Sequence, residues 1–165
     1  MAKTHWKECM QKDYIGAWFC IDEDKELTID HVVKAEEITG EKGRKDSEPV
    51  VYFKEKDANG KALKMVLNAT NSKTLEKLAG SPMIEDWAGL RVTVWADPDV
   101  SFGGQRTGGI RFRSEAPAEL FCDECGSAIK GAYSMSSAQL AAYTKKKYGK
   151  QLCAECAQKA KEAEK

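Results

Sequence analysis

Hydrophobic and polar positions alternate in short runs along the chain before residue 115, and these runs predict β-strands. In the clearest run, Leu90 to Trp95, leucine or valine occupies every second position. Side chains of a strand point alternately to opposite faces, so this run predicts one buried and one exposed face. Four further runs predict strands on the same grounds: residues 27–36, 50–54, 62–68 and 109–113.

Two local signals place a turn and a helix among these strands. The Asn-Gly pair at residues 59–60 suits a tight hairpin turn between the second and third strands, because both residue types tolerate positive φ. The segment 71–79 predicts a helix, with Thr70 or Asn71 as its N-cap and Gly80 at its end.

The resulting order is three strands, a helix and two strands. It predicts a mainly β protein with an OB-like five-stranded barrel, in which one helix lies between strands 3 and 4. The longer connections, residues 39–49 and 97–108, occupy the places where an OB-fold carries its variable binding loops. A small β-sandwich and an SH3-like barrel with an inserted helix are compatible with the same pattern.

The composition changes after residue 115, where β-branched and aromatic runs give way to Ala, Lys, Ser and Cys. We therefore expect an OB-like domain in residues 1–115 and a small module in residues 116–165. Within the module, Ser136 and Gln139 have the spacing of a capping box that opens a helix, and Gly149 is placed to end it.

Four of the six cysteines form two C-x-x-C pairs, Cys122 with Cys125 and Cys153 with Cys156. This spacing is typical of tetrahedral zinc sites, and a reducing compartment favours metal over disulfides. A site filled by four thiolates leaves no position for water, so we predict a structural Zn²⁺ ion in a small α/β module of treble-clef or zinc-ribbon type. Thiol pairs without metal and an iron–sulfur centre are the alternatives.

The other cysteines and the histidines show no spacing that joins them into a site. Cys9, Cys20, His5 and His31 are scattered through the first strand region and the segment before it. We interpret them as terminal or packed residues.

A second candidate site is an outer face of the predicted barrel with its neighbouring loops. Single-stranded nucleic acid needs cations along its phosphates and aromatic rings on which bases stack, at about 1–3 kcal/mol per base. The predicted nucleic-acid-binding residues are Tyr52, Arg91, Trp95, Phe102, Arg106, Arg111 and Arg113. Solubility alone also produces alternating charge on an outer face. The balance of 26 basic and 26 acidic residues argues against tight sequence-independent binding.

Parts of the chain resemble proteins of bacteriophages and prophages. Residues 66–75, 85–92 and 110–113 are similar to a phage family encoded among replication and recombination genes. Residues 122–126 and 143–156, with a Lys-Tyr-Gly-Lys approach to the second cysteine pair, are similar to the four-cysteine tail of some phage recombination mediators and annealing proteins. The resemblance implies an accessory protein that acts near single-stranded DNA.

We therefore expect a non-enzymatic, phage-type accessory protein that binds single-stranded DNA in replication or recombination. The sequence contains no Gly-rich phosphate loop, H-E-x-x-H motif or nucleophile elbow, and it has only two histidines. The alternative is a protein-binding inhibitor of a host defence or replication factor that does not contact DNA.

The predicted zinc module offers a surface for a partner protein or for phosphates, through Lys145, Lys146, Lys147 and Lys150. No apolar run approaches the length of about 18 residues that a membrane span needs, and the first residues do not resemble a signal peptide. We expect a location in the cytoplasm of a bacterial host cell and no membrane contact.

Overall fold

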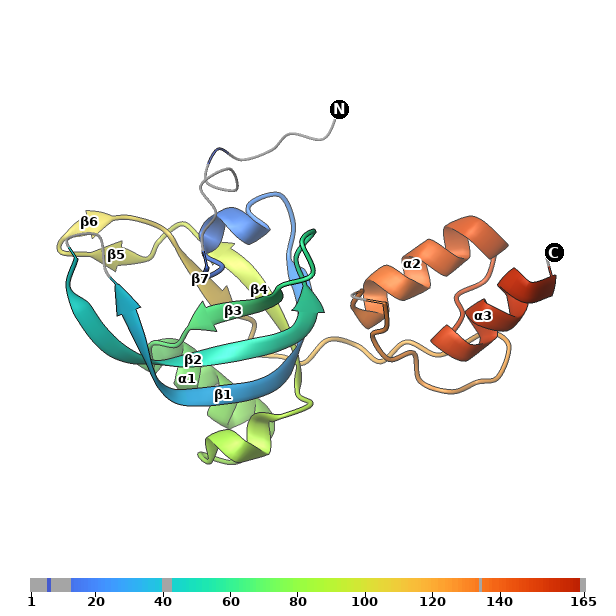
Figure 1. The fold of residues 1–165 in the computed structure, drawn as a ribbon, viewed down its shortest axis with the longest axis horizontal. Coiled ribbons are helices and arrows are strands. Elements are labelled where there is room, and N and C mark those ends of the chain that lie inside the picture. Colours follow the sequence, from blue (N-terminus) through green and yellow to red (C-terminus); the bar gives the residue numbers. More distant parts are fainter. Residues whose placement is uncertain (1–5, 7–12, 40–42, 134, 164–165) are drawn as a thin grey trace. The chain divides into compact units, whose positions relative to one another are not determined.

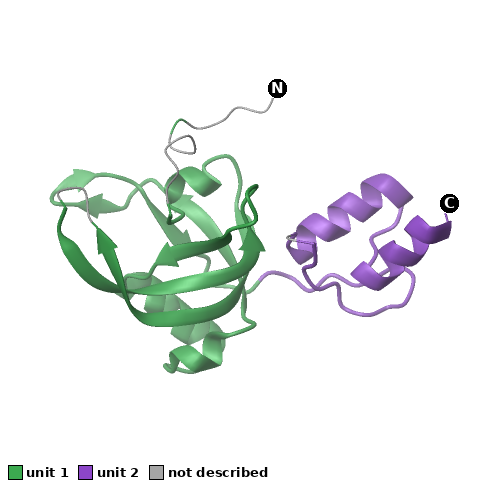
Figure 2. Cartoon of the chain, viewed as in Figure 1, with its two compact units in different colours: residues 1–116 green, residues 117–165 purple. Residues whose placement is uncertain are grey.

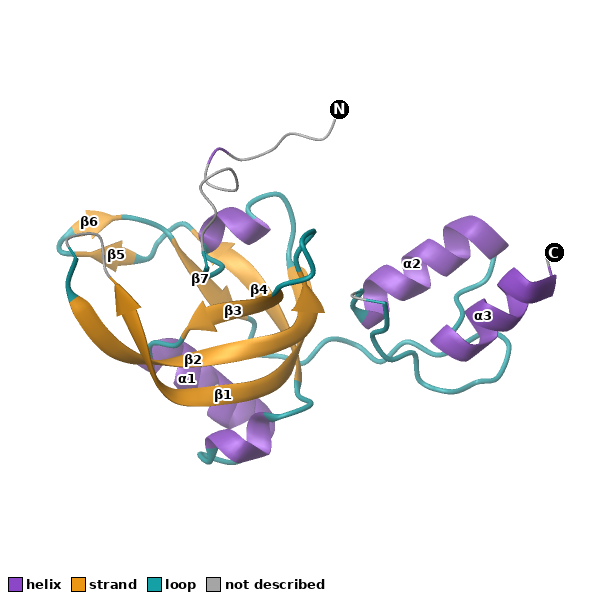
Figure 3. Cartoon of the chain, in the orientation of Figure 1, coloured by secondary structure: helices purple, strands orange, loops and turns teal. Residues whose placement is uncertain are grey.

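The computed structural model describes residues 6, 13–39, 43–133 and 135–163. The chain divides into two compact units, residues 1–116 (unit 1) and residues 117–165 (unit 2), which Figure 2 distinguishes by colour. Each unit has a hydrophobic core of its own. The strands belong to unit 1, whereas helices α2 (Ser137–Tyr148) and α3 (Ala154–Ala163) make up much of unit 2 (Figure 3). Among the described residues, no helix combines the length and hydropathy that a membrane crossing requires.

Unit 1 is built on a five-stranded antiparallel sheet with the order β3-β2-β1-β4-β7 (Figure 1). Its strands are β1 (Lys25–Thr39), β2 (Lys45–Lys56), β3 (Ala62–Val66), β4 (Arg91–Asp97) and β7 (Gly109–Phe112). The connection between β4 and β7 forms a separate hairpin of β5 (Ser101–Phe102) and β6 (Gln105–Arg106). The five predicted strands are therefore all present, and β1 and β2 are longer than expected.

The central strand, β1, pairs with two different partners along its length. Residues 25–28 pair with β4, and residues 29–39 pair with β2. The register with β2 shifts between Ile29 and His31 and again between Val33 and Glu36. Such irregularities bend a strand and increase its twist. The single long strand β1 can therefore pair with β4 at its beginning and with β2 along the rest of its length.

The predicted turn at residues 59–60 joins β2 to β3, which pair antiparallel. Gly60 has a φ of 79°, and the backbone N–H of Asp57 donates to the carbonyl of Lys61 at 2.8 Å. The left-handed conformation explains why glycine occupies this position, since it carries no Cβ that would clash.

Helix α1 (Ala69–Ala79) lies between β3 and β4 in the chain, as predicted. Its N-cap is Asn68, whose side chain accepts a hydrogen bond from the backbone N–H of Asn71 at 2.9 Å. The predicted caps Thr70 and Asn71 were wrong, because Asn68 is an equally good capping residue and lets the helix begin earlier. Gly80 ends the helix with a φ of 68°, as expected.

The sheet is not closed into the predicted barrel, since no ladder joins the edge strands β3 and β7 in the described part of the chain. Other elements bridge these edges. Ile15 donates its backbone N–H to the carbonyl of Lys64 on β3 at 2.8 Å, and the following 3₁₀ helix η2 (Ala17–Cys20) packs against β4 and β7. From α1, the side-chain amide of Asn71 donates to the carbonyl of Ile110 on β7 at 3.1 Å. The observed fold is therefore mixed α/β, with an open antiparallel sheet.

The core of unit 1 follows the alternation read from the sequence. Val92 and Val94 of β4 are completely buried, as the pattern predicts, and burial of each such side chain contributes about 1.5–3 kcal/mol. Trp87, in the 3₁₀ helix η3 (Ile84–Trp87), is also buried and donates its indole N–H to the carbonyl of Ser81 at 2.9 Å. The large ring is therefore buried without an unpaired polar atom.

Glu36 of β1 joins several elements through one carboxylate. Its Oε1 accepts hydrogen bonds from Lys64 Nζ and from the Tyr14 hydroxyl, each at 2.6 Å. Its Oε2 accepts from the Tyr52 hydroxyl, also at 2.6 Å. Lys64 lies on β3 and Tyr52 on β2, so this network connects three neighbouring strands with the segment before η2. The bonds from Lys64, Tyr14 and Tyr52 lower the pKa of Glu36 to about 2.

We predict that Glu36→Gln flattens the acid side of the stability profile of unit 1. The folded-state pKa of Glu36 is about 2 and its ordinary value is 4.5. The ionised carboxylate therefore contributes stability that is fully present above the ordinary pKa and is lost as the pH falls towards the folded-state pKa. Urea unfolding measured between about pH 6 and pH 3 should show a smaller loss of stability in the variant than in the wild type.

Tryptophan fluorescence reports this unfolding from unit 1 alone, because all four tryptophans lie before residue 117. The matched control is Glu115→Gln, which neutralises an exposed carboxylate of the same unit. The prediction fails if Glu36→Gln and the wild type lose stability to the same extent as the pH falls.

Candidate metal centre and nucleic-acid interface

The first cysteine pair lies in a tight turn near the beginning of unit 2. The backbone N–H of Cys122 donates to the carbonyl of Ser127 at 2.8 Å, and that of Gly126 donates to the carbonyl of Cys122 at 2.9 Å. Gly126 has a φ of 70°, a conformation that favours glycine. The glycine directly after the C-x-x-C pair therefore lets the chain fold back around the two thiols.

The second cysteine pair lies at the beginning of α3. Cys153 immediately precedes the helix, and its carbonyl accepts the N–H of Ala157 at 2.9 Å. Cys156 lies in the first turn. Residues three apart at the start of a helix share one side, so the helix presents both thiols in the same direction.

Helix α2 fixes the path of the chain towards the second pair. The predicted capping box is confirmed: the Gln139 N–H donates to Ser136 Oγ at 3.2 Å, and the Ser136 N–H donates to Gln139 Oε1 at 2.9 Å. The buried hydroxyl of Thr144 accepts the backbone N–H of Leu152 at 2.9 Å. This bond holds the residue before Cys153 against the helix.

Hydrogen bonds also connect the two cysteine-bearing segments directly. The Asp123 N–H donates to the carbonyl of Gln151 at 2.9 Å, and the Gln151 N–H donates to Asp123 Oδ2 at 2.8 Å. The Gln151 side chain donates to the carbonyl of Phe121 at 3.0 Å. These reciprocal bonds place the turn of the first pair beside the approach to the second.

The four cysteines meet as a result. Their Sγ atoms all lie within 4.8 Å of one another, and those of Cys125 and Cys153 are 3.7 Å apart. A tetrahedral zinc ion with Zn–S bonds of about 2.3 Å would separate its sulfurs by about 3.8 Å. The prediction that Cys122, Cys125, Cys153 and Cys156 form one cluster is confirmed, and this cluster can hold a metal ion.

The surroundings of the first pair favour thiolates, the form that binds metal. The backbone and side chain of Ser127 donate to Cys125 and lower its pKa to about 6. Burial raises the pKa of Cys122, but backbone N–H groups around it outweigh burial and lower its pKa overall. Contacts with Cys153, together with burial, raise the pKa of Cys156 to about 12. A metal ion would have to displace that proton, so metal affinity should rise with pH.

The remaining cysteine and histidine positions form no further cluster among the described residues. Cys20 is buried in the core of unit 1, and burial raises its pKa to about 11, which makes it an inert packed thiol. His31 stacks on Tyr52, with ring centroids 4.7 Å apart. His5 and Cys9 lie outside the described residues.

The arginines predicted to bind nucleic acid do not form a surface of unpaired cations. Each one faces a carboxylate: Arg91 with Glu26 at 3.0 Å, Arg106 with Asp99 at 3.5 Å, Arg111 with Asp97 at 3.9 Å and Arg113 with Asp24 at 2.8 Å. Glu26 lies on β1 and Asp24 directly precedes that strand. Asp97 ends β4, and Asp99 follows it. The alternation in the sequence identified the arginines, but it did not show which acidic residues the folded chain would place beside them.

The predicted residues fall into three places. Arg91, Trp95 and Arg111 lie on β4 and β7, where Trp95 pairs with Arg111. Arg113 directly follows β7, and its guanidinium lies 4.1 Å from the centre of the Trp95 ring. Phe102 and Arg106 lie on the β5–β6 hairpin, and Phe102 is 82% exposed. Tyr52 belongs to the Glu36 network on β2 and is not part of either group.

A cleft of about 620 Å³ that sequence reasoning missed lies in unit 1. The residues that line it include Tyr14 and Trp18 from the N-terminal side, Ile38 and Thr39 at the end of β1, and Thr107 after the hairpin. The β5–β6 hairpin accordingly lies near the end of β1 and the beginning of β2 (Figure 1). The residues before β1 carried no periodic signal, so only the adjacent aromatic residues 18 and 19 could have drawn attention to them.

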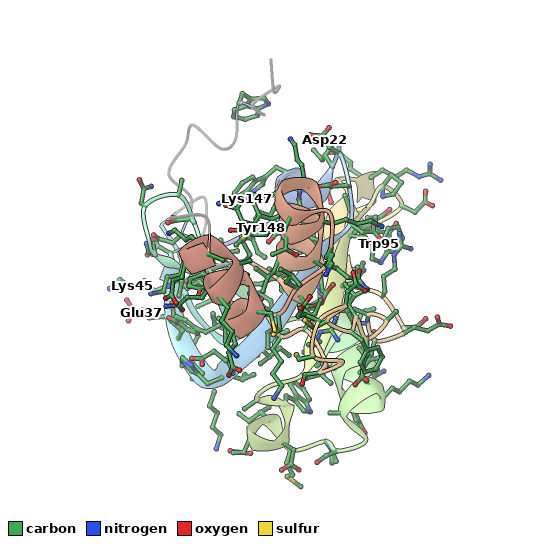
Figure 4. The ribbon with its side chains drawn as sticks, turned by 90° about the vertical axis from the view of Figure 1, so that its right-hand side faces the viewer. Asp22, Glu37, Lys45, Trp95, Lys147 and Tyr148 are labelled. Carbon is green, nitrogen blue, oxygen red and sulfur yellow. The ribbon has the colours of Figure 1, made fainter. Side chains whose placement is uncertain are left out.

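One exposed ion pair joins a residue of this cleft to the neighbouring strand. Glu37, which lines the cleft, pairs with Lys45 at 2.7 Å, and Figure 4 labels the two side chains together. The pair connects the last residues of β1 with the first residue of β2.

No protein-family model, no curated protein and no solved structure matches the chain. The assignment of both candidate sites is therefore based on the residues and their geometry.

We predict that removal of metal unfolds unit 2 and leaves unit 1 folded. The described core of unit 2 is small, with Ile129, Leu140, Ala141 and Leu152 as its buried apolar residues beside Cys122. Metal coordination contributes on the order of 10 kcal/mol to such modules. Stripping the protein with a chelator should abolish the helical circular dichroism of α2 and α3 without changing tryptophan fluorescence.

Cys153→Ser should have the same effect as the chelator, because it removes one ligand. The control is Cys20→Ala, which removes a cysteine outside the cluster and should leave the metal content at about one ion per chain. A fully helical unit 2 in the stripped protein would contradict the prediction.

Proposed function

We propose that the chain is a non-catalytic protein that binds single-stranded DNA through unit 1, while a structural zinc ion folds unit 2. The observation that carries the proposal is the position of the 620 Å³ cleft at the end of β1, together with the exposed Phe102 on the β5–β6 hairpin. Both belong to segments that an OB-fold uses for binding.

The order β3-β2-β1-β4-β7, with a helix between β3 and β4, supports an OB-like assignment in which the barrel is open between β3 and β7. OB-folds bind oligonucleotides at the face of strands 2 and 3 and at the loops that follow strands 1 and 4. The cleft has the end of β1 on one side and residues 107–108, from the connection after β4, on the other. This correspondence supports the cleft as the binding site.

The chemistry of this region suits unpaired bases. Phe102 is 82% exposed, so its ring is open to stacking, and the partly exposed Trp18 lines the cleft. The hairpin tip carries Gly103 and Gly104, with φ values of 60° and 81°, and the tight turn they form holds Phe102 away from the sheet. Arg106 and Asp99 are both largely exposed, and such pairs contribute only about 0–1 kcal/mol. A phosphate can therefore replace Asp99 as the partner of Arg106.

The β4–β7 face supports DNA binding less well than the sequence suggested. Arg91 and Arg111 are mostly buried beside Glu26 and Asp97, with 22% and 20% of their side chains exposed. A phosphate that approached them would meet those carboxylates. We assign this face a stabilising role and place the proposed DNA contacts in the cleft and on the hairpin.

For unit 2, thiolate ligands favour zinc over harder divalent ions, and the sulfur spacing supports a closed tetrahedral site. One cysteine pair in a turn and the other at the start of a helix support the treble-clef alternative over the zinc ribbon. The setting in bacteriophage replication or recombination follows from the sequence resemblance alone.

A second candidate function is the inhibition of a host defence or replication protein by direct binding. The carboxylate beside each predicted arginine favours it, because paired charges of both signs suit a protein surface better than a polyanion. The test of the first proposal separates the two.

We expect the zinc-loaded chain to bind a fluorescein-labelled thymidine oligomer of about 16 nucleotides, with an affinity that falls as salt increases. Phe102→Ala should weaken this binding by roughly 5-fold to 150-fold, which corresponds to about 1–3 kcal/mol for one stacked base. Fluorescence anisotropy at low and at raised salt measures both effects.

Phe121→Ala is the matched control, because Phe121 is also exposed, at 52%, but lies in unit 2. It should leave oligonucleotide binding unchanged. Absence of salt-dependent binding at low salt would refute the proposal and favour the protein-binding inhibitor. Equal oligonucleotide affinity of Phe102→Ala and the wild type would show that the hairpin does not contact the oligonucleotide.

A further inference from the structure

Unit 2 contains a groove of about 580 Å³ that has no part in the metal cluster. Residues from α2, from α3 and from the turn before α2 line it. Its apolar part includes Met135, Leu140 and Ala157, and three tyrosines, Tyr133, Tyr143 and Tyr148, surround this part. The volume lies within the range of about 300–1,000 Å³ that is typical of ligand pockets.

Two of the tyrosines present their rings to solvent. Tyr133 is 64% exposed and Tyr143 is 48% exposed. Tyr133 also has a φ of 55°, the only positive φ of a non-glycine residue in the described part of the chain. This conformation is unfavourable for an L-residue, and such strain persists where the surrounding structure imposes it. The fold therefore holds an exposed aromatic ring beside an apolar groove at an energetic cost.

The turn around Tyr133 is tightly packed. A Cβ atom at Gly131 would lie 2.8 Å from the carbonyl oxygen of Met135, and the Met135 N–H donates to the carbonyl of Ala132 at 3.0 Å. The close packing at Gly131 and the hydrogen bond between Met135 and Ala132 therefore fix the turn that contains Tyr133.

Each of the two helices contributes one lysine to the lining of the groove. Lys147 of α2 and Lys161 of α3 line it, and Glu162 is the one acidic residue among the lining residues. Helix α2 carries three lysines in its last turn and has no acidic residue. Lys147 Nζ lies 4.9 Å from the centre of the Tyr148 ring, and Figure 4 labels these two side chains together. Cations therefore border an aromatic and aliphatic surface.

We propose that this groove binds an acidic peptide segment of a partner protein, with apolar side chains of the peptide in the groove and its carboxylates at Lys147 and Lys161. A hollow with aliphatic lining accepts side chains, whereas sequential base stacking needs a series of open, flat rings. Lysines on both helices complement carboxylates and steer an acidic partner towards the groove. The site is independent of DNA binding by unit 1.

The groove also depends on the metal cluster for its shape. Helix α3, one of its walls, begins between the ligands Cys153 and Cys156. A chain without metal should therefore lose peptide binding together with the helices.

The test is a selection of peptides from a yeast-displayed library of random sequence, about twelve residues long, on the zinc-loaded full chain. We expect the selected peptides to combine aspartate or glutamate with aromatic or aliphatic residues. For the most enriched peptide, fluorescence anisotropy should show at least a tenfold weaker affinity for Lys147→Glu combined with Lys161→Glu. Tyr133→Asn should also weaken binding, and it should remain folded because asparagine tolerates positive φ.

Lys130→Glu is the matched control, because Lys130 is exposed in unit 2 and does not line the groove. It should change the affinity less than twofold. Enrichment of basic peptides, no enrichment at all, or equal affinity of the groove variants and the wild type would each overturn the proposal. So would loss of oligonucleotide binding in the groove variants, since this would assign the groove to nucleic acid.

Discussion

The convergence of four thiols is the constraint on which unit 2 depends. The first pair is placed by a turn with Gly126 in the left-handed conformation, and the second by the start of α3. The reciprocal bonds between Asp123 and Gln151 hold these segments together. With so small an apolar core, we expect the unit to need the coordination energy of an ion to offset the conformational entropy lost on folding. The proposed binding of a peptide by the groove of unit 2 therefore depends on the four thiols.

Unit 1 obtains its stability from a different source. Alternating apolar residues bury one face of a twisted sheet, and the bent strand β1 connects the two halves of that sheet. The carboxylate of Glu36 then fixes β1, β2 and β3 to the segment before η2. That segment lines the cleft, so the same network that stabilises the sheet also positions the proposed binding site.

Local signals predicted local structure well. The alternation at residues 90–95, the Asn-Gly turn, the capping box at Ser136 and the cysteine spacing each depend on residues close in sequence, and each was confirmed. Closure of the barrel was predicted wrongly, because it depends on whether β3 and β7 meet, and residues 15–20 lie between them without a periodic signal. The acidic partners of the arginines were missed for a related reason. Asp24 and Arg113 are distant in sequence and meet only through strand pairing.

X-ray absorption spectroscopy at the zinc edge of the purified chain tests the central claim most directly. If the four thiolates hold one structural ion, the spectrum should show four sulfur neighbours at about 2.3 Å and no oxygen or nitrogen ligand. A protein without bound zinc, or a zinc ion with water or nitrogen among its ligands, would contradict the account.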